Sequence, residues 1–255
     1  MSAAPPDSDP VGTVSRFVPS PNHGERRGGR QPDLLLLHYT GMPTAEAALR
    51  RLCDPAAEVS SHYLVMEDGA VVQLVPEDRR AHHAGAGSWA GETDINSCSI
   101  GIEIVNPGHE GGLPPYPDRQ IDAVIALCRS IIDHWRIPAE RVLAHSDIAP
   151  SRKEDPGELF PWERLARAGI GHWVEPEPLA DEIAVAPGDS GPEVEALQDA
   201  LAFYGYGIET TGTYDEATRQ VVTAFQRHFR PARVDGVVDT STLATLQNLI
   251  TARSS

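Results

Sequence analysis

Short apolar runs alternate with amphipathic segments along the first two thirds of this 255-residue chain. Leu34 to Leu37 is a continuous apolar run and Val142 to Ala144 is another, and such runs are typical of buried strands. Between them, residues 118–135 repeat apolar side chains at helical spacing until Pro138 intervenes. Strands that alternate with helices predict an α/β fold, with a mixed β-sheet flanked by helices.

Two local signals add a hairpin and a helix to this outline. Tyr63 to Met66 and Val71 to Val75 flank Asp68-Gly69, a pair that is typical of the turn of a β-hairpin. Thr44 is suited to cap a helix that runs through Leu52, because its hydroxyl can accept a hydrogen bond from a free backbone N–H.

Residues that can bind a metal follow both apolar runs. His38 comes directly after the leucines, His145 directly after Ala144, and Asp155 lies on the loop beyond. A catalytic zinc takes three protein ligands from His, Asp, Glu or Cys and leaves a fourth position for water. Each of these residues alone is more often structural than catalytic. Strand ends hold side chains rigidly, however, and together the three residues form a candidate zinc site.

Two further charged residues could take part in catalysis. Glu103 lies in the apolar run Ser99 to Val105, and the period of two places it on the same strand face as Val105. A carboxylate on a covered face has a raised pKa, which suits a general base or acid near neutral pH. Lys153 stands two residues before Asp155, close enough to reach an oxyanion, although most lysines are simply solvated.

Five motifs, in consistent order between Val14 and Trp173, resemble those of the zinc N-acetylmuramoyl-L-alanine amidases. The similarity is strongest to the AmiD branch, which is related to AmpD and to the peptidoglycan recognition proteins. The motifs are His38-Tyr-Thr, Ser60-Ser-His62-Tyr63-Leu-Val, His83-Ala-Gly, Ser99-Ile-Gly-Ile-Glu103 and His145-Ser-Asp-Ile-Ala-Pro-Ser-Arg-Lys153-Glu-Asp155-Pro-Gly.

The resemblance implies a hydrolase of the amide that joins N-acetylmuramic acid, ordinary or 1,6-anhydro, to L-alanine. It implies one Zn²⁺ in the catalytic domain, held by His38, His145 and Asp155. It makes Glu103 and Lys153 catalytic. In the mechanism we expect, Glu103 takes a proton from the attacking water and passes it to the leaving nitrogen, while Lys153 stabilises the oxyanion.

The remaining motif residues are candidates for substrate binding. His62, Tyr63 and His83 match family motifs, and we expect them to line the groove or to pack behind it. His82, which precedes His83, departs from the family pattern, where tryptophan is common at this position.

Two other kinds of protein fit part of this pattern. A recognition protein would bind a muropeptide without cutting it, but such a protein typically lacks a ligand or the base. A zinc peptidase that cuts within the stem peptide uses similar chemistry, and the metal site does not exclude it.

Composition limits the partners and the compartment. A net charge of −16 argues against binding to nucleic acid or to an anionic membrane through a broad basic surface, and it does not exclude a glycan. The partner that the resemblance implies is peptidoglycan or a muropeptide. The three cysteines show no CxxC spacing, so a disulfide framework is not expected. The first thirty residues hold no apolar run of signal-peptide length, and no segment is apolar enough to span a membrane. We therefore expect a cytoplasmic enzyme of peptidoglycan recycling, with the cell envelope as the alternative.

A second domain is expected after Trp173, where proline and acidic residues break the periodicity. Residues 1–13 form an N-terminal tail, 14–173 the catalytic domain, 174–187 a linker, and 188–252 a small all-α domain. A weak repeat, Gly212-Thr-Tyr-Asp215 and Gly236-Val-Val-Asp239, places a turn and a capping residue before two of its helices.

This pattern resembles the three-helix peptidoglycan-binding domain. The alternative is a small helical bundle that merely packs on the enzyme. A separate linker and a separate core predict that truncation after Trp173 leaves hydrolysis of a soluble muropeptide nearly intact. Such a truncation would weaken action on the insoluble wall, where an anchor raises the effective concentration.

Overall fold

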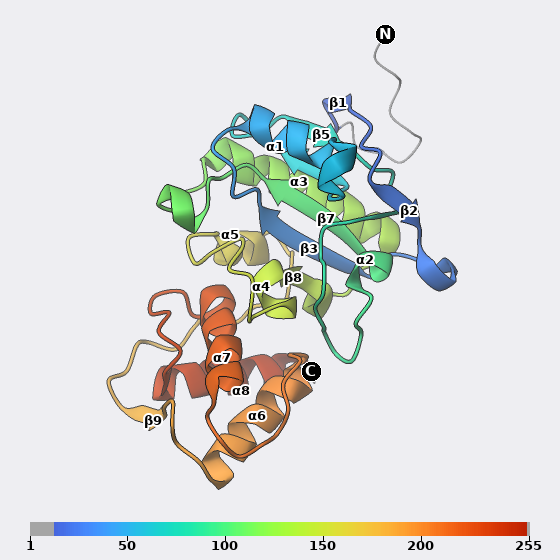
Figure 1. Cartoon of the computed structure of the whole chain (residues 1–255). Helices are drawn as coiled ribbons and strands as arrows, with labels where there is room; N and C mark the ends of the chain where they lie inside the picture. Colours follow the sequence, from blue (N-terminus) through green and yellow to red (C-terminus); the bar gives the residue numbers. More distant parts are fainter. Residues whose placement is uncertain (1–12, 254–255) are drawn as a thin grey trace.

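The computed structural model describes residues 13–253, so the expected N-terminal tail lies outside the described residues except for Thr13. A mixed sheet with helices on it forms the upper part of the molecule in Figure 1, and three helices form the lower part. The predicted fold class is therefore confirmed. No helix among the described residues is long and apolar enough to cross a membrane, and the cytoplasmic location stays a prediction.

The main sheet has six strands, and only its β4–β5 pair is antiparallel. The predicted hairpin is this pair, and the leucine run becomes the central strand β3. The strands lie in the order β1 (Arg16–Phe17), β5 (Val71–Gln73), β4 (Tyr63–Val65), β7 (Ser99–Ile104), β3 (Leu34–Tyr39) and β8 (Val142–Ala144). A separate two-stranded sheet pairs β2 (His23–Glu25) with β6 (Arg79–Ala81).

Two helices cover opposite faces of the sheet. The long helix α3 (Asp118–Trp135) has the predicted bounds and packs on the face that carries Ile100, Ile102 and Ile104. Helix α1 (Ala45–Leu52) packs on the other face, which carries Val105, and Thr44 Oγ1 caps it by accepting from Ala47 N–H at 3.1 Å. The alternation of side chains along β7 therefore predicted correctly which of them lie on each face of the sheet.

Three short helices complete the upper part. Helix α2 (Ile95–Cys98) leads into β7, α4 (His145–Ile148) follows β8 directly, and α5 (Trp162–Arg167) lies after the loop beyond α4. The sequence predicted the strand before His145 but not the helical turn that begins there.

The lower part consists of α6 (Pro192–Tyr204), α7 (Glu216–Phe229) and α8 (Thr240–Arg253), with a small sheet of β9 (Ile183–Val185) and β10 (Val238–Asp239). The sequence repeat is present in the structure. Gly212 and Gly236 both adopt φ +69°. Asp215 accepts from Thr218 N–H at 2.9 Å, and Asp239 accepts from Thr242 N–H at 2.7 Å.

A buried glutamine fixes each copy of this repeat. The side-chain oxygen of Gln198 accepts from the backbone N–H of Gly212 at 2.9 Å, and that of Gln226 accepts from Gly236 at 2.8 Å. Because the same side chain ties the same turn twice, the repeat is structural and not a chance of composition.

The two parts share one hydrophobic core. Leu34, Leu36 and Ile148 of the sheet domain belong to the same buried cluster as Tyr206 and Phe225 of the helical domain. In Figure 1, α7 lies below and to the left of α4, and the two helices are in contact. The expectation of a separate core for the C-terminal domain is therefore wrong, because a linker in the sequence does not reveal which faces meet after folding.

Candidate active site

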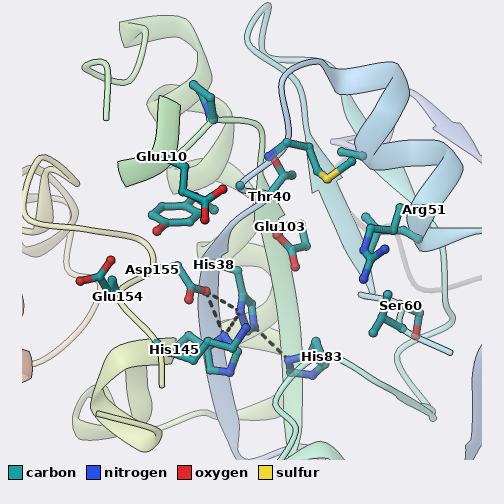
Figure 2. A pocket seen from close by; sticks show the side chains of 18 of the residues that line it. His38, Thr40, Arg51, Ser60, His83, Glu103, Glu110, His145, Glu154 and Asp155 are labelled. Carbon is teal, nitrogen blue, oxygen red and sulfur yellow. Dashed lines mark hydrogen bonds and ion pairs between the residues drawn. The ribbon is translucent and has the colours of Figure 1, made fainter. Parts of the chain in front are cut away.

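A cavity of about 390 Å³ opens at the carboxyl ends of the parallel strands, on the face that α1 covers in part. Figure 2 shows the side chains that line it. All five residues predicted to hold metal or to catalyse lie on its wall: His38, Glu103, His145, Lys153 and Asp155.

Sheet register brings the first two metal-binding candidates together. Leu37 of β3 pairs with Ala144 of β8, so His38 and His145, each one residue further on, leave neighbouring strand ends. Asp155 comes from the loop after α4, and its carbonyl accepts from Ser146 N–H at 3.1 Å, which ties this loop to α4. Adjacent parallel strands thus provide two of the side chains, and a loop held by the same helix provides the third.

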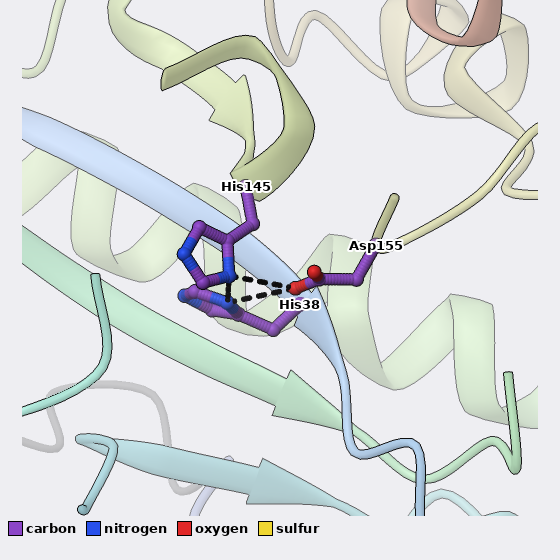
Figure 3. Close-up of side chains that lie close together, drawn as sticks. All are labelled: His38, His145 and Asp155. Atoms are coloured by element: carbon purple, nitrogen blue, oxygen red, sulfur yellow. Dashed lines mark hydrogen bonds and ion pairs between the residues drawn. The ribbon is translucent and has the colours of Figure 1, made fainter. Parts of the chain in front are cut away.

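Three atoms of these residues converge on one point (Figure 3). His38 Nδ1 lies 2.9 Å from His145 Nδ1, and each nitrogen lies 3.0 Å from Asp155 Oδ2. All three residues are buried. Two ring nitrogens this close to each other and to a carboxylate form a donor set for a metal ion, since an imidazole binds a metal through its unprotonated nitrogen.

The ionisation of this cluster favours metal binding. Burial and then His145 lower the pKa of His38 to about 4. Burial alone would raise the pKa of Asp155, but His145 and His38 outweigh it and hold that pKa well below its usual range. At neutral pH a neutral imidazole and an ionised carboxylate are therefore available, which are the forms that bind metal.

Outer contacts fix the rings of both histidines. An imidazole that binds metal through Nδ1 carries its proton on Nε2 and donates it to a second group. His38 Nε2 lies 3.0 Å from His83 Nδ1, and His145 Nε2 lies 2.9 Å from the carbonyl oxygen of Ala84. His83 Nε2 in turn lies 3.2 Å from Ser99 Oγ. The segment after β6 thereby holds both rings.

Gly101 makes room for this outer contact. A Cβ atom at Gly101 would lie 2.5 Å from the ring of His83, a distance at which something must shift. The φ angle of Gly101 is not positive, so its backbone conformation does not demand glycine. Glycine is required here because the ring of His83 approaches the backbone closely. The sequence left open whether His83 lines the groove or packs behind it. The structure places His83 on the cavity wall and in contact with His38, a contact that no sequence motif indicated.

Glu103 lies next to the cluster with a free acceptor. It pairs in register with His38 across β7 and β3, so both side chains rise from the same face. Its Oε2 atom is buried, and no hydrogen-bond partner for it is found in residues 13–253. Burial first, and then the charge of Asp155, raise the pKa of Glu103 well above its ordinary value, while Lys153 acts in the opposite direction. A raised pKa suits proton transfer near neutrality.

Comparison with known proteins now identifies the family. Residues 28–158 match the family model of N-acetylmuramoyl-L-alanine amidases, and residues 190–246 match a peptidoglycan-binding domain. The chain belongs to the N-acetylmuramoyl-L-alanine amidase family. The activity of this family is hydrolysis of the amide between N-acetylmuramic acid and L-alanine.

Individual relatives agree with this assignment. N-acetylmuramoyl-L-alanine amidase AmiD of Escherichia coli K12 is 39% identical over 85% of this chain and 82% of its own length. Its solved complex with anhydro-N-acetylmuramic acid-L-Ala-D-γ-Glu-L-Lys has a TM-score of 0.74 and covers 87% of this chain and 89% of that chain. AmpDh3 of Pseudomonas aeruginosa is 29% identical, with a TM-score of 0.73 and full coverage of both chains.

In this amidase, His62 and Tyr63 are buried and are not among the residues that line the cavity. His62 is 0% exposed, and its ring lies between Gly101 N–H and the carbonyl oxygen of Arg79, each at a distance of about 3.0 Å. Burial lowers the pKa of His62 to about 3, so the ring is neutral. Tyr63 is 2% exposed, and its hydroxyl donates to Glu77 at 2.7 Å. Of the three predicted substrate-binding residues, His83 alone lines the cavity.

The structure adds His109 to the cavity wall, a residue to which the sequence analysis gave no role. The hydroxyl of Tyr39 lies 3.0 Å from His109 Nδ1, and His109 Nε2 lies 3.0 Å from Glu158 Oε2. The hydrogen bond to Glu158 is the main cause of a raised pKa at His109. His109 begins a short 3₁₀ helix (His109–Gly111) in a glycine-rich segment without periodicity, so only the fold could place it here.

Proposed function

We propose that this amidase is zinc-dependent and acts on muropeptides, with His38, His145 and Asp155 as the zinc ligands and with Glu103 and Lys153 as the catalytic residues. One observation carries the proposal. Three buried donor atoms that lie within 4.8 Å of one another share a cavity with a carboxylate oxygen for which the described residues supply no partner.

The donor set suits zinc. Two imidazole nitrogens and one carboxylate oxygen form a three-ligand set that leaves a coordination position open, as in catalytic zinc sites. A zinc ion held there would lower the pKa of a bound water to about 7 and polarise the substrate carbonyl. His83 and Ala84 would keep the two ligand rings oriented toward it.

Glu103 is the proposed general base and acid. Its raised pKa and free Oε2 allow it to accept a proton from the attacking water and then to donate that proton to the leaving L-alanine nitrogen. The register of β7 against β3 holds it beside His38. A rigid strand position keeps the distance over which the proton moves short.

Lys153 is the proposed oxyanion-stabilising residue. It lines the same cavity, and within residues 13–253 its ammonium group has no hydrogen bond or ion pair. A free ammonium group is available to the negative charge that develops on the carbonyl oxygen. Its backbone N–H donates to Ala149 at 3.1 Å, which anchors the residue close to the end of α4.

The proposed substrate includes the 1,6-anhydro form of the sugar. The solved structure of AmiD from Escherichia coli contains an anhydro-N-acetylmuramic acid tripeptide, and a structure of AmpDh3 from Pseudomonas aeruginosa contains an anhydromuramic pentapeptide. We assign the catalytic domain to residues 14–173, the linker to 174–187 and a glycan-binding domain to 188–252, with strand β9 at the end of the linker paired to β10 of that domain. The match of residues 190–246 to a peptidoglycan-binding domain supports the last assignment.

Mass spectrometry of a digest tests which bond is cut. The zinc-loaded chain is incubated with a purified anhydromuropeptide, and the products are compared with those of the Glu103→Gln variant. Free stem peptide and intact sugar, absent with the variant, support the proposal. A shortened peptide that is still attached to sugar indicates a peptidase, and tight binding without any product indicates a recognition protein.

A further inference from the structure

A buried carboxylate joins the metal cluster to the C-terminal domain. Asp147 lies on α4, two residues after His145, and it is 0% exposed. Its Oδ2 atom accepts from Ala144 N–H at 2.8 Å, at the start of α4. The same oxygen lies 2.7 Å from His228 Nδ1, and Oδ1 accepts from the hydroxyl of Tyr206 at 2.8 Å. Two of the three partners therefore belong to the C-terminal domain.

These two partners are themselves held firmly. His228 lies on α7, is 2% exposed, and stacks on Trp162 of α5 with ring centroids 3.8 Å apart. Tyr206 is 3% exposed and packs against Trp89 with ring centroids 5.0 Å apart. Both donors come from the C-terminal domain and pack against tryptophans of the catalytic domain, so the interface between the two domains holds the carboxylate of Asp147.

Helix α4 transmits this restraint to the metal donors. His145 is its first residue, and Ser146 holds the backbone carbonyl of Asp155. A second contact reaches the same loop, because Arg227 of α7 donates to Glu154 at 2.8 Å, one residue before Asp155. A shift of α4 would therefore move two of the three donors relative to His38.

We propose that the C-terminal domain positions the metal centre, with Tyr206 and His228 acting through Asp147 to hold His145 and Asp155 in place. This role is additional to wall binding, and it rests on the proposed metal site. Tyr206 and His228 are positioning residues, since neither side chain lines the cavity. If the buried carboxylate of Asp147 loses a hydrogen-bond donor, the free-energy cost of its desolvation is no longer offset. Helix α4 is therefore expected to shift until the carboxylate finds another donor.

The experiment removes the two donors but keeps the rings. Tyr206→Phe deletes one hydroxyl, and His228→Phe keeps a ring to stack on Trp162. The matched control is Tyr214→Phe in the full chain, because Tyr214 is 2% exposed, and its hydroxyl donates at 2.8 Å to Gly236 within the C-terminal domain. Zinc affinity is measured by competition with a chelator, and the visible absorption spectrum is recorded after Co²⁺ substitution.

The single variants and the double variant are expected to bind zinc about 10-fold more weakly and to change the Co²⁺ spectrum. This is the lower end of the range for direct outer contacts of metal ligands, because Tyr206 and His228 act through Asp147. Tyr214→Phe should match the wild type in zinc affinity and in the Co²⁺ spectrum. Circular dichroism confirms folding, and the single Tyr206→Phe variant decides the matter if the double variant unfolds.

Unchanged affinity and spectrum in folded Tyr206→Phe and His228→Phe would overturn the inference and leave a merely structural contact. Wild type that binds no zinc would overturn it together with the metal site. Wild type that binds zinc but cuts no muropeptide would overturn the proposed function alone, because the affinities of the variants still decide the positioning role.

Discussion

His38 and Glu103 are register partners on the neighbouring parallel strands β3 and β7. One is a metal donor and the other carries a buried oxygen without a described partner, so the sheet itself places the metal site beside the proposed base. Neither loop movement nor domain closure is needed to bring these two side chains together.

Glu103→Gln should lower turnover by about 10²- to 10⁴-fold, because the amide cannot accept the proton. Zinc should remain bound, since Glu103 is not among the three clustered donors. Glu110→Gln is the matched control, because Glu110 lines the same cavity and has no proposed role. Turnover near that of the control, with zinc retained, would show that Glu103 is not the base.

The same variant should be more stable than the wild type at neutral pH. The pKa of Glu103 is raised above its ordinary value of 4.5, so the folded state holds the proton more tightly than the unfolded state does. That contribution to stability is fully present below pH 4.5 and is lost as pH rises through the folded pKa. Thermal unfolding of the metal-free chains should give Glu103→Gln the higher Tm at pH 7 and a smaller difference at pH 4. Equal Tm values at pH 7 would contradict the raised pKa.

Gly101→Ala should weaken zinc binding although residue 101 contacts no metal donor. A Cβ atom would lie 2.5 Å from the ring of His83 and displace it from His38, at a cost in stability of about 1–3 kcal/mol. His83→Ala should produce a similar loss of affinity, about 10- to 100-fold. Gly24→Ala is the control, because nothing lies within 4 Å of a Cβ atom at that position. Wild-type affinity in both Gly101→Ala and His83→Ala would refute the orienting contact.

Truncation after Trp173 should impair hydrolysis of soluble muropeptide as well as of insoluble peptidoglycan. The cut removes Tyr206 and Phe225 from a core that they share with Leu34 and Leu36. The exposed apolar surface should lower Tm and favour aggregation. Full activity on the soluble substrate, with loss only on the insoluble one, would support the separable wall anchor that the sequence suggested.

Several strands and helix α3 could be predicted from the sequence because their signals are local. The cluster of His38, His145 and Asp155 was indicated instead by the positions of the two histidines at strand ends and by the family motifs. The leucine run, the alternation around Glu103 and the helical spacing of residues 118–135 each reflect contacts made by consecutive or nearby residues. The short strand β1 and the pair β2 and β6 carry too few residues for a periodic signal, so no pattern in the sequence indicates them.

Contacts between distant segments were beyond the sequence where neither a strand end nor a family motif indicated them. His83 meets His38 across 45 positions, and His228 meets Asp147 across 81 positions. No pattern within either segment records such a meeting, because the partner is chosen by how the sheet and the helical domain pack. The expectation of a separate core for the C-terminal domain was wrong for the same reason, because an apolar stripe on a helix does not indicate which surface will cover it.

Loss of the metal is the most direct test of the account. The chain is stripped with a chelator, its metal content is measured, and release of stem peptide from an anhydromuropeptide is followed while zinc is added back. The account predicts one zinc per chain, no activity in the stripped enzyme, and full recovery at one equivalent. It also predicts that His38→Ala, His145→Ala and Asp155→Ala bind no stoichiometric zinc and stay inactive. Wild type that binds no stoichiometric zinc, or that releases the peptide equally well after stripping, would contradict it.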